Sequence, residues 1–538
     1  MVNPGPIRYV TRALNSLRPI SLLFLSLLLT VGSPSNDARS AGLDLTRLHW
    51  TSGDHLIVAF PVTARGAFFR VSPMSVRSWT DEDYSLRPSD ELGLMRLNLS
   101  PSVVATGNAW PVFQTYMAQL ELETREYIAD AQEGNASIDA YDPERQYRNG
   151  WGDARLLQAF VQAVGEHWVL KAGLMRSNWG LGLLSNDNSE PEAGAFESPF
   201  GSARYVDQYM RAQLVSFPLA KKKRGLDSYH PLTLALAGDA TVQDATSDWF
   251  DGDRTYTGIG AVLVEFPTVK AGVYVAHRIQ EHALGGRTQV TAVDVVADLR
   301  FRLGKTHLRF MSEAALIVGE TDYAQSVFND GTYDVFGHGG VARFAVKHGM
   351  FEGVFEAGWA SGDDNPYDDT VRSFSFSSGY RVGVLMFGEA LRTAATVSAL
   401  NISDPELRDE VPRALDRVTH RGVVRDAVFL NPRVAVRPVD ELCLMAGFLY
   451  GRSLGAYTDP FWTSLEGGTS AGPNGALRQT ELGVELDVAI QYDFSIAHVN
   501  LGLRGEFAYF APGSVFDLPS GESAADVFGF GLHLEARL

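Results

Sequence analysis

The feature that most constrains this chain is a two-residue alternation that recurs along it and continues to its last residue. In DVFGFGLHLEARL, residues 526–538, apolar side chains alternate with glycine, histidine, glutamate and arginine. Successive side chains of a β-strand point to opposite faces, so one face of such a strand is apolar and the other polar. Segment 526–538 is therefore predicted as a strand that separates two different environments.

The same pattern recurs in other segments. VTAVDVVADLRFRL (290–303), TELGVELDVAIQY (480–492) and HVNLGLRGEFAYF (498–510) alternate strictly, and AQLELETREY (118–127) and HLRFMSEAALIV (307–318) alternate more loosely. The face opposite the apolar one carries charges of both signs. A soluble β-sandwich also alternates, so this pattern alone leaves two fold classes open.

The lengths of the connections separate these two classes. Short links are predicted near residues 165–166, 267–268, 304–305, 348–349, 438–440 and 493–495, and long polar loops near 128–151, 177–204, 241–255, 280–287, 320–334, 362–371, 452–478 and 511–525. Short and long connections take turns, which is typical of periplasmic turns and extracellular loops in outer-membrane barrels. The predicted fold class is all-β, a transmembrane antiparallel up-and-down β-barrel.

The bilayer explains why such a sheet has to close. Hydrocarbon offers no water to an edge strand, so every backbone group must be paired around a ring. Hairpins counted back from the end give about 18 strands, with 16 to 20 tolerated, because an even number returns both termini to the periplasm. Residues 372–387 and 389–400 form a doubtful further pair. The last strand is expected to pair with the first, although Leu538 departs from the terminal Phe or Trp that the barrel assembly machinery reads.

Residues 1–33 have the organisation of a cleaved export signal. Three arginines, Arg8, Arg12 and Arg18, precede the apolar run PISLLFLSLLLTVG, and Val31-Gly32-Ser33 suits a signal peptidase. A run of about 14 residues is too short for a transmembrane helix, which needs roughly 20. A cut near 38–41 and a membrane anchor are the alternatives. Residues 34–65 are predicted as a periplasmic lead-in or an extra strand, and residues 66–538 as the barrel.

Composition excludes several classes of protein. The 538-residue chain is 45% hydrophobic and 20% charged, which is too apolar for a disordered protein. Its net charge of -18 argues against a nucleic-acid partner. Cys443 is the only cysteine, so the exported chain has no internal disulfide, and the thiol is expected to be a small packing group.

Motifs that could carry chemistry are weak. Residues 468–472 match Gly-x-Ser-x-Gly but lie in a Gly/Pro-rich loop without the strand-to-helix turn of a nucleophile elbow, so a chance match is expected. Aspartates 363, 364, 368 and 369 could hold calcium, yet their spacing is not that of an EF-hand, and a solvated acidic loop is expected. KKKRG (221–225) is expected at a periplasmic turn, solvated or against anionic headgroups. No catalytic residue, cofactor or metal site is predicted.

Part of the chain resembles a known family. FEAGWASGDDNPYDD (355–369), SFSFSSGYRVGVLMFGEALRTAA (373–395), TELGVELDVAIQYDFSIAHVNLGLRGEFAYFAPG (480–513) and, upstream, LKAGLMRSNWGLGLLSND (170–187) resemble the alginate export family and related porin-like proteins of proteobacteria. The resemblance implies a single-chain, monomeric barrel whose polar, arginine-rich lumen passes an anionic polysaccharide. The charges here are mixed, and wall carboxylates repel carboxylated sugars, which argues against a dedicated polyanion substrate.

The charged face is predicted to line a wet lumen, because a ring of about 18 strands encloses more space than side chains fill. The predicted lumen-lining residues are Asp298, Arg300, Arg302, Arg309, Glu313, Arg343, Glu352, Glu356, Glu481, Glu485, Asp487, Arg504, Glu506, Glu535 and Arg537. Such residues set the selectivity of a pore. The alternative for any one of them is a structural salt bridge. Loops 177–204 and 388–426 are candidates to fold inward and narrow the passage.

Two functions from different classes follow from this fold. The first is an outer-membrane channel that passes small polar solutes or an oligosaccharide or polysaccharide. The second is a surface scaffold with a closed lumen, whose extracellular loops bind a partner; a membrane-embedded hydrolase is a distant third, and no enzyme activity is predicted. The expected location is the bacterial outer membrane. The expected partners are outer-membrane lipid, the barrel assembly machinery and the polar solute or saccharide, with no nucleic acid and no cofactor.

Overall fold

The computed structural model describes most of the chain beyond the N-terminal region. The described residues are 43–44, 49–52, 56–72, 74–76, 86–87, 90–110, 113–130, 154–187, 207–222, 228–283, 285–323, 331–365, 368–402, 423–496 and 499–537. The predicted signal peptide therefore lies outside the described residues and stays a prediction.

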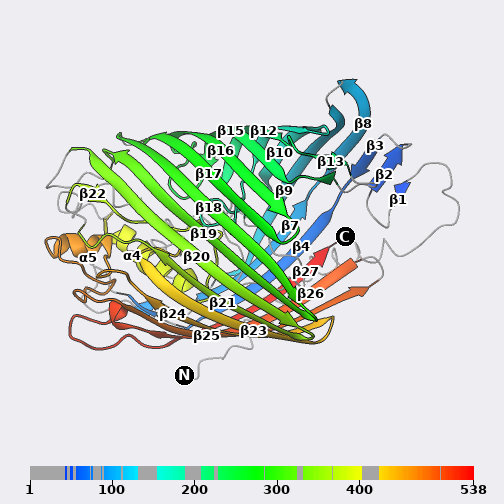
Figure 1. Ribbon diagram of the computed structural model, residues 1–538. Helices are drawn as coiled ribbons and strands as arrows, with labels where there is room; N and C mark the ends of the chain where they lie inside the picture. Colours follow the sequence, from blue (N-terminus) through cyan, green and yellow to red (C-terminus); the bar gives the residue numbers. More distant parts are fainter. Residues whose placement is uncertain are drawn as a thin grey trace.

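Eighteen antiparallel strands form one closed ring, which confirms the predicted fold class (Figure 1). In ring order they are β4 (Val62–Val71), β7 (Asp90–Leu99), β9 (Phe113–Asp130), β10 (Ala154–Val164), β11 (Trp168–Met175), β12 (Gln208–Ser216), β15 (Leu232–Gln243), β16 (Arg254–Phe266), β17 (Val269–Glu281), β18 (Arg287–Leu303), β19 (Thr306–Thr321), β20 (Tyr333–His348), β21 (Phe351–Ala360), β23 (Ala427–Val439), β24 (Leu442–Arg452), β25 (Glu481–Ile496), β26 (Val499–Pro512) and β27 (Val527–Arg537). The ring closes where β27 pairs with β4, from Gly529 opposite Val71 to Arg537 opposite Thr63. The strand that ends the sequence is thus the strand that seals the barrel.

Most short connections lie at one end of the barrel, called here the turn end, and most long ones at the other, the loop end; the exceptions include residues 217–231 between β12 and β15 at the turn end and 282–286 between β17 and β18 at the loop end. Turns join β16 to β17 at 267–268 and β18 to β19 at 304–305, whereas residues 361–426 separate β21 from β23. The turn predicted at 493–495 is wrong, because β25 continues to Ile496 and pairs Asp493 with Gly502. The alternation of inward and outward side chains in β25 continues past Tyr492, so the strand does not end there.

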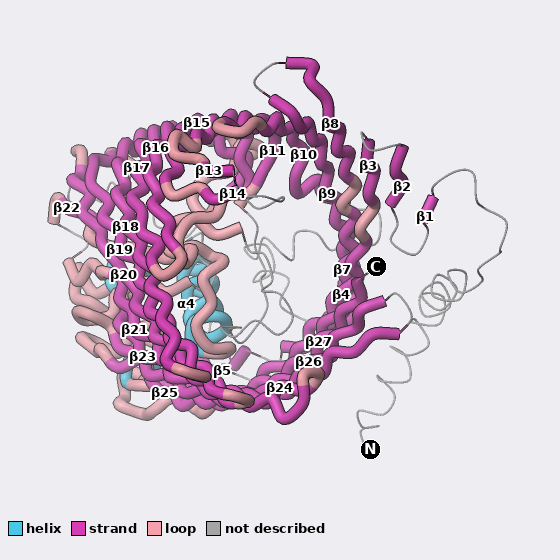
Figure 2. Tube along the Cα trace, turned by 45° about the vertical axis from the view of Figure 1, so that its right-hand side comes forward, coloured by secondary structure: helices cyan, strands magenta, loops and turns pink. Residues whose placement is uncertain are grey.

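The doubtful strand pair at 372–387 and 389–400 is also wrong. After the short strand β22 (Thr370–Val371), the chain forms the π-helix η3 (Met386–Leu391) and the helix α4 (Arg392–Ile402). Figure 2 shows α4 inside the ring of strands. Phe374, Phe376 and Phe387 are each at most 2% exposed, because the inner wall of the barrel buries them.

Smaller elements decorate the ring. The first part of β9 pairs with β8 (Ser102–Trp110), which pairs with β3 (Leu56–Ala59), and β2 (His49–Ser52) and β1 (Leu43–Asp44) continue this extension at the turn end. The strands β1 to β3 and the start of β4 thus lie within the region predicted as a lead-in. The remaining elements are β5 (Met74–Ser75), β6 (Leu86–Arg87), β13 (Lys221–Lys222), β14 (Ser228–Tyr229), α5 (Pro460–Leu465) and η6 (Ser514–Phe516).

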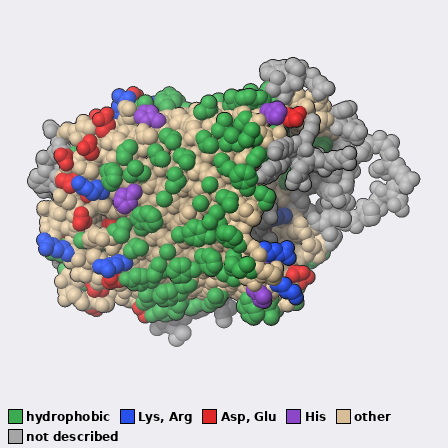
Figure 3. All heavy atoms as spheres, in the orientation of Figure 1, with side chains coloured by type: hydrophobic (Ala, Val, Ile, Leu, Met, Phe, Trp, Pro, Cys, Tyr) green, Lys and Arg blue, Asp and Glu red, His purple; other side chains and the backbone are tan. Residues whose placement is uncertain are grey.

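The outside of the barrel is apolar around its middle. Leu236, Val295 and Phe530 are 66%, 46% and 47% exposed at outward positions. Figure 3 shows hydrophobic side chains gathered over the middle of the strands, with charged side chains towards the two ends. Such a band matches the hydrocarbon of a bilayer flanked by two polar interfaces. Within the described residues, none of the helices has the length and hydropathy required to cross a membrane.

Candidate functional site

The candidate site is the interior of the barrel, and strand β18 shows how the sequence builds its wall. Val293 and Val295 are 38% and 46% exposed on the outside, while Asp294 between them is fully buried inside. Because side chains alternate across a strand, every second residue of each wall strand enters the lumen. Two segments of chain then fold inward and cover parts of this wall.

Five wall carboxylates each contact two basic side chains. These are Asp298 with Arg300 (2.6 Å) and Arg309 (2.9 Å), Glu352 with Lys347 (2.6 Å) and Arg437 (3.4 Å), Glu356 with Arg343 (2.9 Å) and Arg433 (2.7 Å), Glu506 with Arg504 (2.5 Å) and His533 (3.3 Å), and Glu535 with Arg65 (3.4 Å) and Arg537. In four of these clusters two cations face one carboxylate, and in the fifth Arg504 and the imidazole of His533 face Glu506, so these clusters give the wall from β18 to β4 an excess of positive charge.

In the clusters around Asp298 and Glu352 the most exposed side chains are cations. The side chains of Arg300, Arg309 and Lys347 are 46%, 38% and 43% exposed, whereas those of Asp298 and Glu352 are 12% and 2% exposed. A solute in the lumen therefore meets guanidinium and ammonium groups before it meets a carboxylate. A ring of like charges of this kind sets the preference of a pore for ions of the opposite sign.

The first inner loop, residues 176–187, leaves β11 and crosses the inner wall. Arg176 pairs with Glu121 of β9 (2.5 Å), and Ser177 accepts a hydrogen bond from Arg211 of β12 (2.9 Å). The indole of Trp179 donates to Asp294 of β18 (3.2 Å). The loop is thus held by polar bonds to three strands.

Glu313 of β19 completes this attachment. Its carboxylate accepts the backbone N–H of Leu181, and that of Leu183 at 2.9 Å. Gly182 lies between them with a φ of 90°, a left-handed conformation that glycine adopts without a steric cost. The glutamate therefore satisfies backbone donors that would otherwise be buried without partners.

The second inner loop, residues 373–402, covers the wall from β20 to β27. Glu485 of β25 accepts three consecutive backbone N–H groups, those of Val384 (2.5 Å), Leu385 (2.8 Å) and Met386 (2.6 Å). Tyr380 donates its hydroxyl to Glu356 at 2.7 Å. Glu485 thus binds backbone N–H groups of the second inner loop in the same way that Glu313 binds those of the first.

Apolar packing adds to the attachment of the second inner loop. Phe374, Phe376 and Phe387 pack with Phe429 of β23 in a buried cluster. A Cβ atom at Gly529 of β27 would lie 2.8 Å from Leu385, so glycine leaves room for that side chain. The two inner loops meet where Ser377 N–H donates to the carbonyl of Leu183 (2.7 Å), and together they form a continuous shelf on the wall.

Two loop carboxylates support the second inner loop from the loop end. Asp459 caps α5 by accepting the N–H groups of Phe461 (3.1 Å) and Trp462 (3.0 Å), and Ser398 of α4 donates to the same oxygen (3.0 Å). Burial raises the pKa of Asp459 to about 7. Burial likewise raises the pKa of Asp426, next to the start of β23, to about 7.

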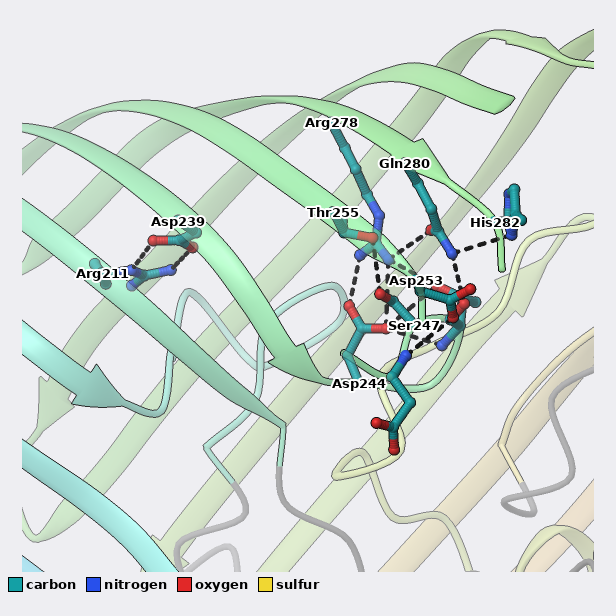
Figure 4. A network of polar contacts seen from close by, with 11 residues as sticks. Arg211, Asp239, Asp244, Ser247, Asp253, Thr255, Arg278, Gln280 and His282 are labelled. Carbon is teal, nitrogen blue, oxygen red and sulfur yellow. Dashed lines mark hydrogen bonds and ion pairs between the residues drawn. The ribbon is translucent and has the colours of Figure 1, made fainter. Parts of the chain in front are cut away.

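A second polar network joins β15 to β18 at the loop end (Figure 4). Arg278 donates to Asp244 (2.5 Å), and Gln280 donates to the carbonyl of Thr246 (2.7 Å). Asp253, which is fully buried, accepts the N–H groups of Asp248 (3.0 Å) and Ala283 (2.9 Å). Figure 4 also shows Arg211 facing Asp239 across the wall, a bidentate pair with both N–O distances at 2.7 Å. These bonds fix the rim of the barrel.

The predicted lumen residues, with one exception, lie at inward positions of their strands. The inner loops cover Glu313, Glu485 and Asp487 and reach Glu356 through Tyr380; Glu352 and Glu506 are buried among their basic partners, and Arg300 and Arg309 are the more exposed charges. The exception is Glu481, which lies on the outer face, bonded to Tyr450 (2.7 Å) and paired with Arg452 (3.4 Å). A β-bulge at Gly483, whose φ is 124°, shifts the register and turns Leu482 inward instead.

Sequence reasoning missed several inward residues. Arg433 and Arg437 alternate with Val434 and Val436 in β23, so the same two-residue period could have found them. Asp294 lies on the charged face of β18 but was not among the predicted site residues. Arg211 and Asp239 are isolated charges in apolar strands, and only the strand pairing brings them together.

The remaining motifs show no chemistry among the described residues. Ser470 of the elbow-like motif donates its hydroxyl to the carbonyl of Asp364 (3.0 Å). In the acidic loop, Asp368 pairs with Arg372 (2.7 Å), and burial raises the pKa of Asp363. No group of three or more His, Cys, Asp or Glu side chains in the described part of the chain is arranged to hold a metal ion. Cys443 is buried, 1% exposed.

Comparisons with known proteins add a likeness of fold. OpdQ of Pseudomonas aeruginosa is 11% identical, with a TM-score of 0.49 over 89% of this chain and 97% of that chain. OccAB2 of Acinetobacter baumannii is 12% identical, with a TM-score of 0.48 over 89% and 98% of the two chains. No protein-family model and no curated protein matches the sequence. Scores below 0.5 carry no argument, so the fold rests on the strand pairing, and membership of the alginate export family is not confirmed.

Proposed function

We propose that this protein is an outer-membrane channel that passes small polar solutes and prefers anions. The observation that carries the proposal is the exposure of Arg300, Arg309 and Lys347 in the lumen, beside carboxylates that are nearly buried. A closed ring with an apolar exterior suits a bilayer, and a charged interior suits water. Dissolved ions on this path meet a positive wall.

The acidic residues support this reading through their positions. Glu313 and Glu485 are 1% and 0% exposed and bind backbone N–H groups of the inner loops. They contribute little to the charge that a solute meets. The wall therefore differs from the mixture of charges read from the sequence, and an anionic solute, including a carboxylated saccharide short enough to pass the inner loops, is compatible with it.

Conductance of the purified protein in a planar lipid bilayer tests the proposal. In a salt gradient, we expect a reversal potential of the sign that reports anion preference. The double variant Arg300→Glu, Arg309→Glu should move it towards cation preference, because it reverses two exposed lumen charges. Arg452→Gln is the matched control, since Arg452 lies on the outer face and should leave the potential unchanged.

The absence of ion current in folded protein would contradict the proposed channel. Heat-modifiable migration on a gel first establishes that the protein is a folded barrel. If such protein carries no ion current, the alternative function, a scaffold with a closed lumen whose loops bind a partner, takes precedence. The apolar second inner loop is the feature that favours this alternative. We also propose the bacterial outer membrane as the location and a monomer as the functional unit, which fractionation and light scattering would test.

A further inference from the structure

Each inner loop rests on a pair of carboxyl groups, one glutamate and one aspartate from the barrel wall. Both carboxylate oxygens of Glu485 accept hydrogen bonds, one from the N–H groups of Val384 and Leu385 and the other from that of Met386. Asp487, two residues along the same inward face, lies within hydrogen-bonding reach of Glu485. It is 1% exposed, and neither of its carboxylate oxygens has a donor.

The same arrangement occurs under the first inner loop. Glu313 receives the N–H groups of Leu181 and Leu183, and Asp294 lies beside it on the neighbouring strand β18. One oxygen of Asp294 accepts the indole N–H of Trp179, while the other is buried without a donor. The two pairs lie on different strands and hold different loops, so the arrangement arises twice in one barrel.

Two ionised carboxylates cannot share such a site without compensation. A buried charge costs several kcal/mol unless it is paired, and two carboxylates at hydrogen-bonding distance add repulsion, so one of them keeps a proton. Each glutamate is already stabilised as a carboxylate by backbone N–H groups. The proton therefore belongs on the aspartate, where it supplies the hydrogen bond that the aspartate oxygens otherwise lack.

The charged groups around each pair do not include a cation that could neutralise the aspartate in place of the proton. Asp487 faces Glu485 on its own strand, Glu506 on β26 and Arg433 on β23, and Arg433 donates to Glu356 at 2.7 Å. On β24 the residue opposite Asp487 is Gly447, which has no side chain, and Leu449, opposite Glu485, is fully buried.

Asp294 faces Glu313 on β19, Tyr274 on β17 and the indole of Trp179. Arg211, the cation next along the wall, forms its bidentate pair with Asp239. Neither aspartate thus has a basic partner of its own among these neighbours.

We propose that each Asp–Glu pair holds one shared proton, and that loss of this proton at alkaline pH detaches the inner loop above it and widens the lumen. The second charge repels the glutamate from the backbone N–H groups that it binds. The pairs at Asp294 and Asp487 then attach the two inner loops to the wall in a pH-dependent way, and each such pair is called a latch below. The widening of a conducting path rests on the function proposed above, whereas the detachment of the loops does not.

Hydrogen exchange tests the detachment without reference to conduction. Amide protection at 181–183 and 384–386 is measured on the folded, detergent-solubilised protein at about pH 6 and about pH 10, a range that brackets buried carboxyl groups. After correction for intrinsic exchange, we expect protection at these amides to fall at least about tenfold at the higher pH. Amides in β16 and β17 should keep their protection.

The decisive variant is Asp294→Asn with Asp487→Asn. An asparagine amide donates to the glutamate at every pH, so the loops should stay protected at both pH values. Asp440→Asn, at an exposed turn, is the matched control and should behave as the wild type. An infrared difference spectrum at about pH 6 gives a direct readout: the C=O stretch of protonated carboxyl groups should be stronger in the wild type than in the double variant, because Asp426 and Asp459 contribute equally to both spectra.

The outcomes separate the latch from the channel. Equal protection of the wild-type loops at both pH values, or loss of protection at pH 6 in the double variant, overturns the latch. In the bilayer, single-channel conductance should rise, on the order of twofold, at high pH in the wild type and not in the double variant. A pH-dependent exchange with no current would retain the latch and reject the channel; a current with unchanged exchange would do the reverse.

Discussion

The two inner loops are attached to the wall in the same way, but their other contacts differ. In both, a wall glutamate accepts backbone N–H groups and has an aspartate beside it. The first inner loop, 176–187, is otherwise held by polar bonds such as Arg176 to Glu121 and Ser177 to Arg211. The second, 373–402, adds a buried cluster of phenylalanines and the helix α4. The short loop therefore depends on a few directional bonds, and the long one on apolar area as well.

This difference in support determines how each inner loop responds to a substitution in the wall. A polar bond is lost completely when one partner is removed, and the other partner stays buried without compensation. Apolar area is lost in proportion to the atoms removed. We therefore expect the first inner loop to come away from the wall as a unit, and the second to loosen locally.

The largest effect is expected from Glu313→Ala. It leaves the N–H groups of Leu181 and Leu183 without an acceptor and removes the carboxyl group beside Asp294, which keeps the indole N–H of Trp179, at a cost of roughly 3–6 kcal/mol in total. Proteolysis of the folded barrel should then cut within 176–187. Glu485→Ala should lower stability by a similar amount yet leave 373–402 resistant, because its apolar cluster remains. Equal cutting of both loops would contradict the comparison, and Glu320→Ala, at an exposed position, is the control.

Arg211→Met should have the next largest effect. Asp239, whose side chain is 2% exposed, loses its bidentate partner, and Ser177 loses its donor. An uncompensated buried carboxylate costs about 3–4 kcal/mol. Adding Asp239→Leu should restore most of the stability in urea, because the charge that needed a partner is gone. A double variant as unstable as the single one would show that the bond to Ser177, and not the ion pair, is what matters.

A pH dependence is expected where the second inner loop returns to the wall. Burial raises the pKa of Asp426 to about 7, from an ordinary value of 3.8. Between these pH values the folded protein keeps a proton that the unfolded chain has released, so stability falls as pH rises from about 4 to about 7 and then stays level. The fall attributable to Asp426 is on the order of 2–4 kcal/mol.

Asp426→Asn tests this dependence. The slope of stability against pH in that interval should decrease but persist, because burial also raises the pKa of Asp459 to about 7 and gives the same sign. Adding Asp459→Asn should reduce the slope further, and the slope that remains comes from groups such as Asp294 and Asp487, whose proposed shared protons the unfolded chain also releases. Urea titrations at four pH values would measure it, and a profile that rises with pH in the wild type would contradict the assignment.

Gly529→Ala should have a smaller effect, on the second inner loop alone. The added Cβ would lie 2.8 Å from Leu385, which is fully buried and has little room to move. Overpacking of this kind costs about 1–2 kcal/mol. Gly66→Ala is the matched control, because a Cβ there meets nothing within 4 Å. Its stability should stay within about 0.5 kcal/mol of the wild type.

Much of the wall was predictable from the sequence, because lipid and water impose a period of two on every spanning strand. This period alone assigns Asp298, Arg300 and Arg309 to the face opposite the apolar one, and their role in lining a solute path stays a prediction. The inner loops were not predictable in form, since a segment inside a barrel is buried on several sides and loses the contrast between two faces. The alternating phenylalanines at 374 and 376 therefore imitate a strand. A single sequence also does not show which residues of neighbouring strands lie opposite each other, which is why Arg211 and Asp239 were missed.

Glu481→Gln should have the smallest effect, and it tests the one predicted lumen residue that the structure places outside. Glu481 contacts Tyr450 and Arg452 on the outer face, and its side chain is 42% exposed. An exposed ion pair contributes about 0–1 kcal/mol, so stability should barely change. Neither inner loop should respond, since the bulge at Gly483 separates Glu481 from the inward Leu482. The reversal potential should also stay at the wild-type value; a shift towards anion preference, opposite in sign to that of the Arg300→Glu, Arg309→Glu variant, would mean that Glu481 faces the solute path after all.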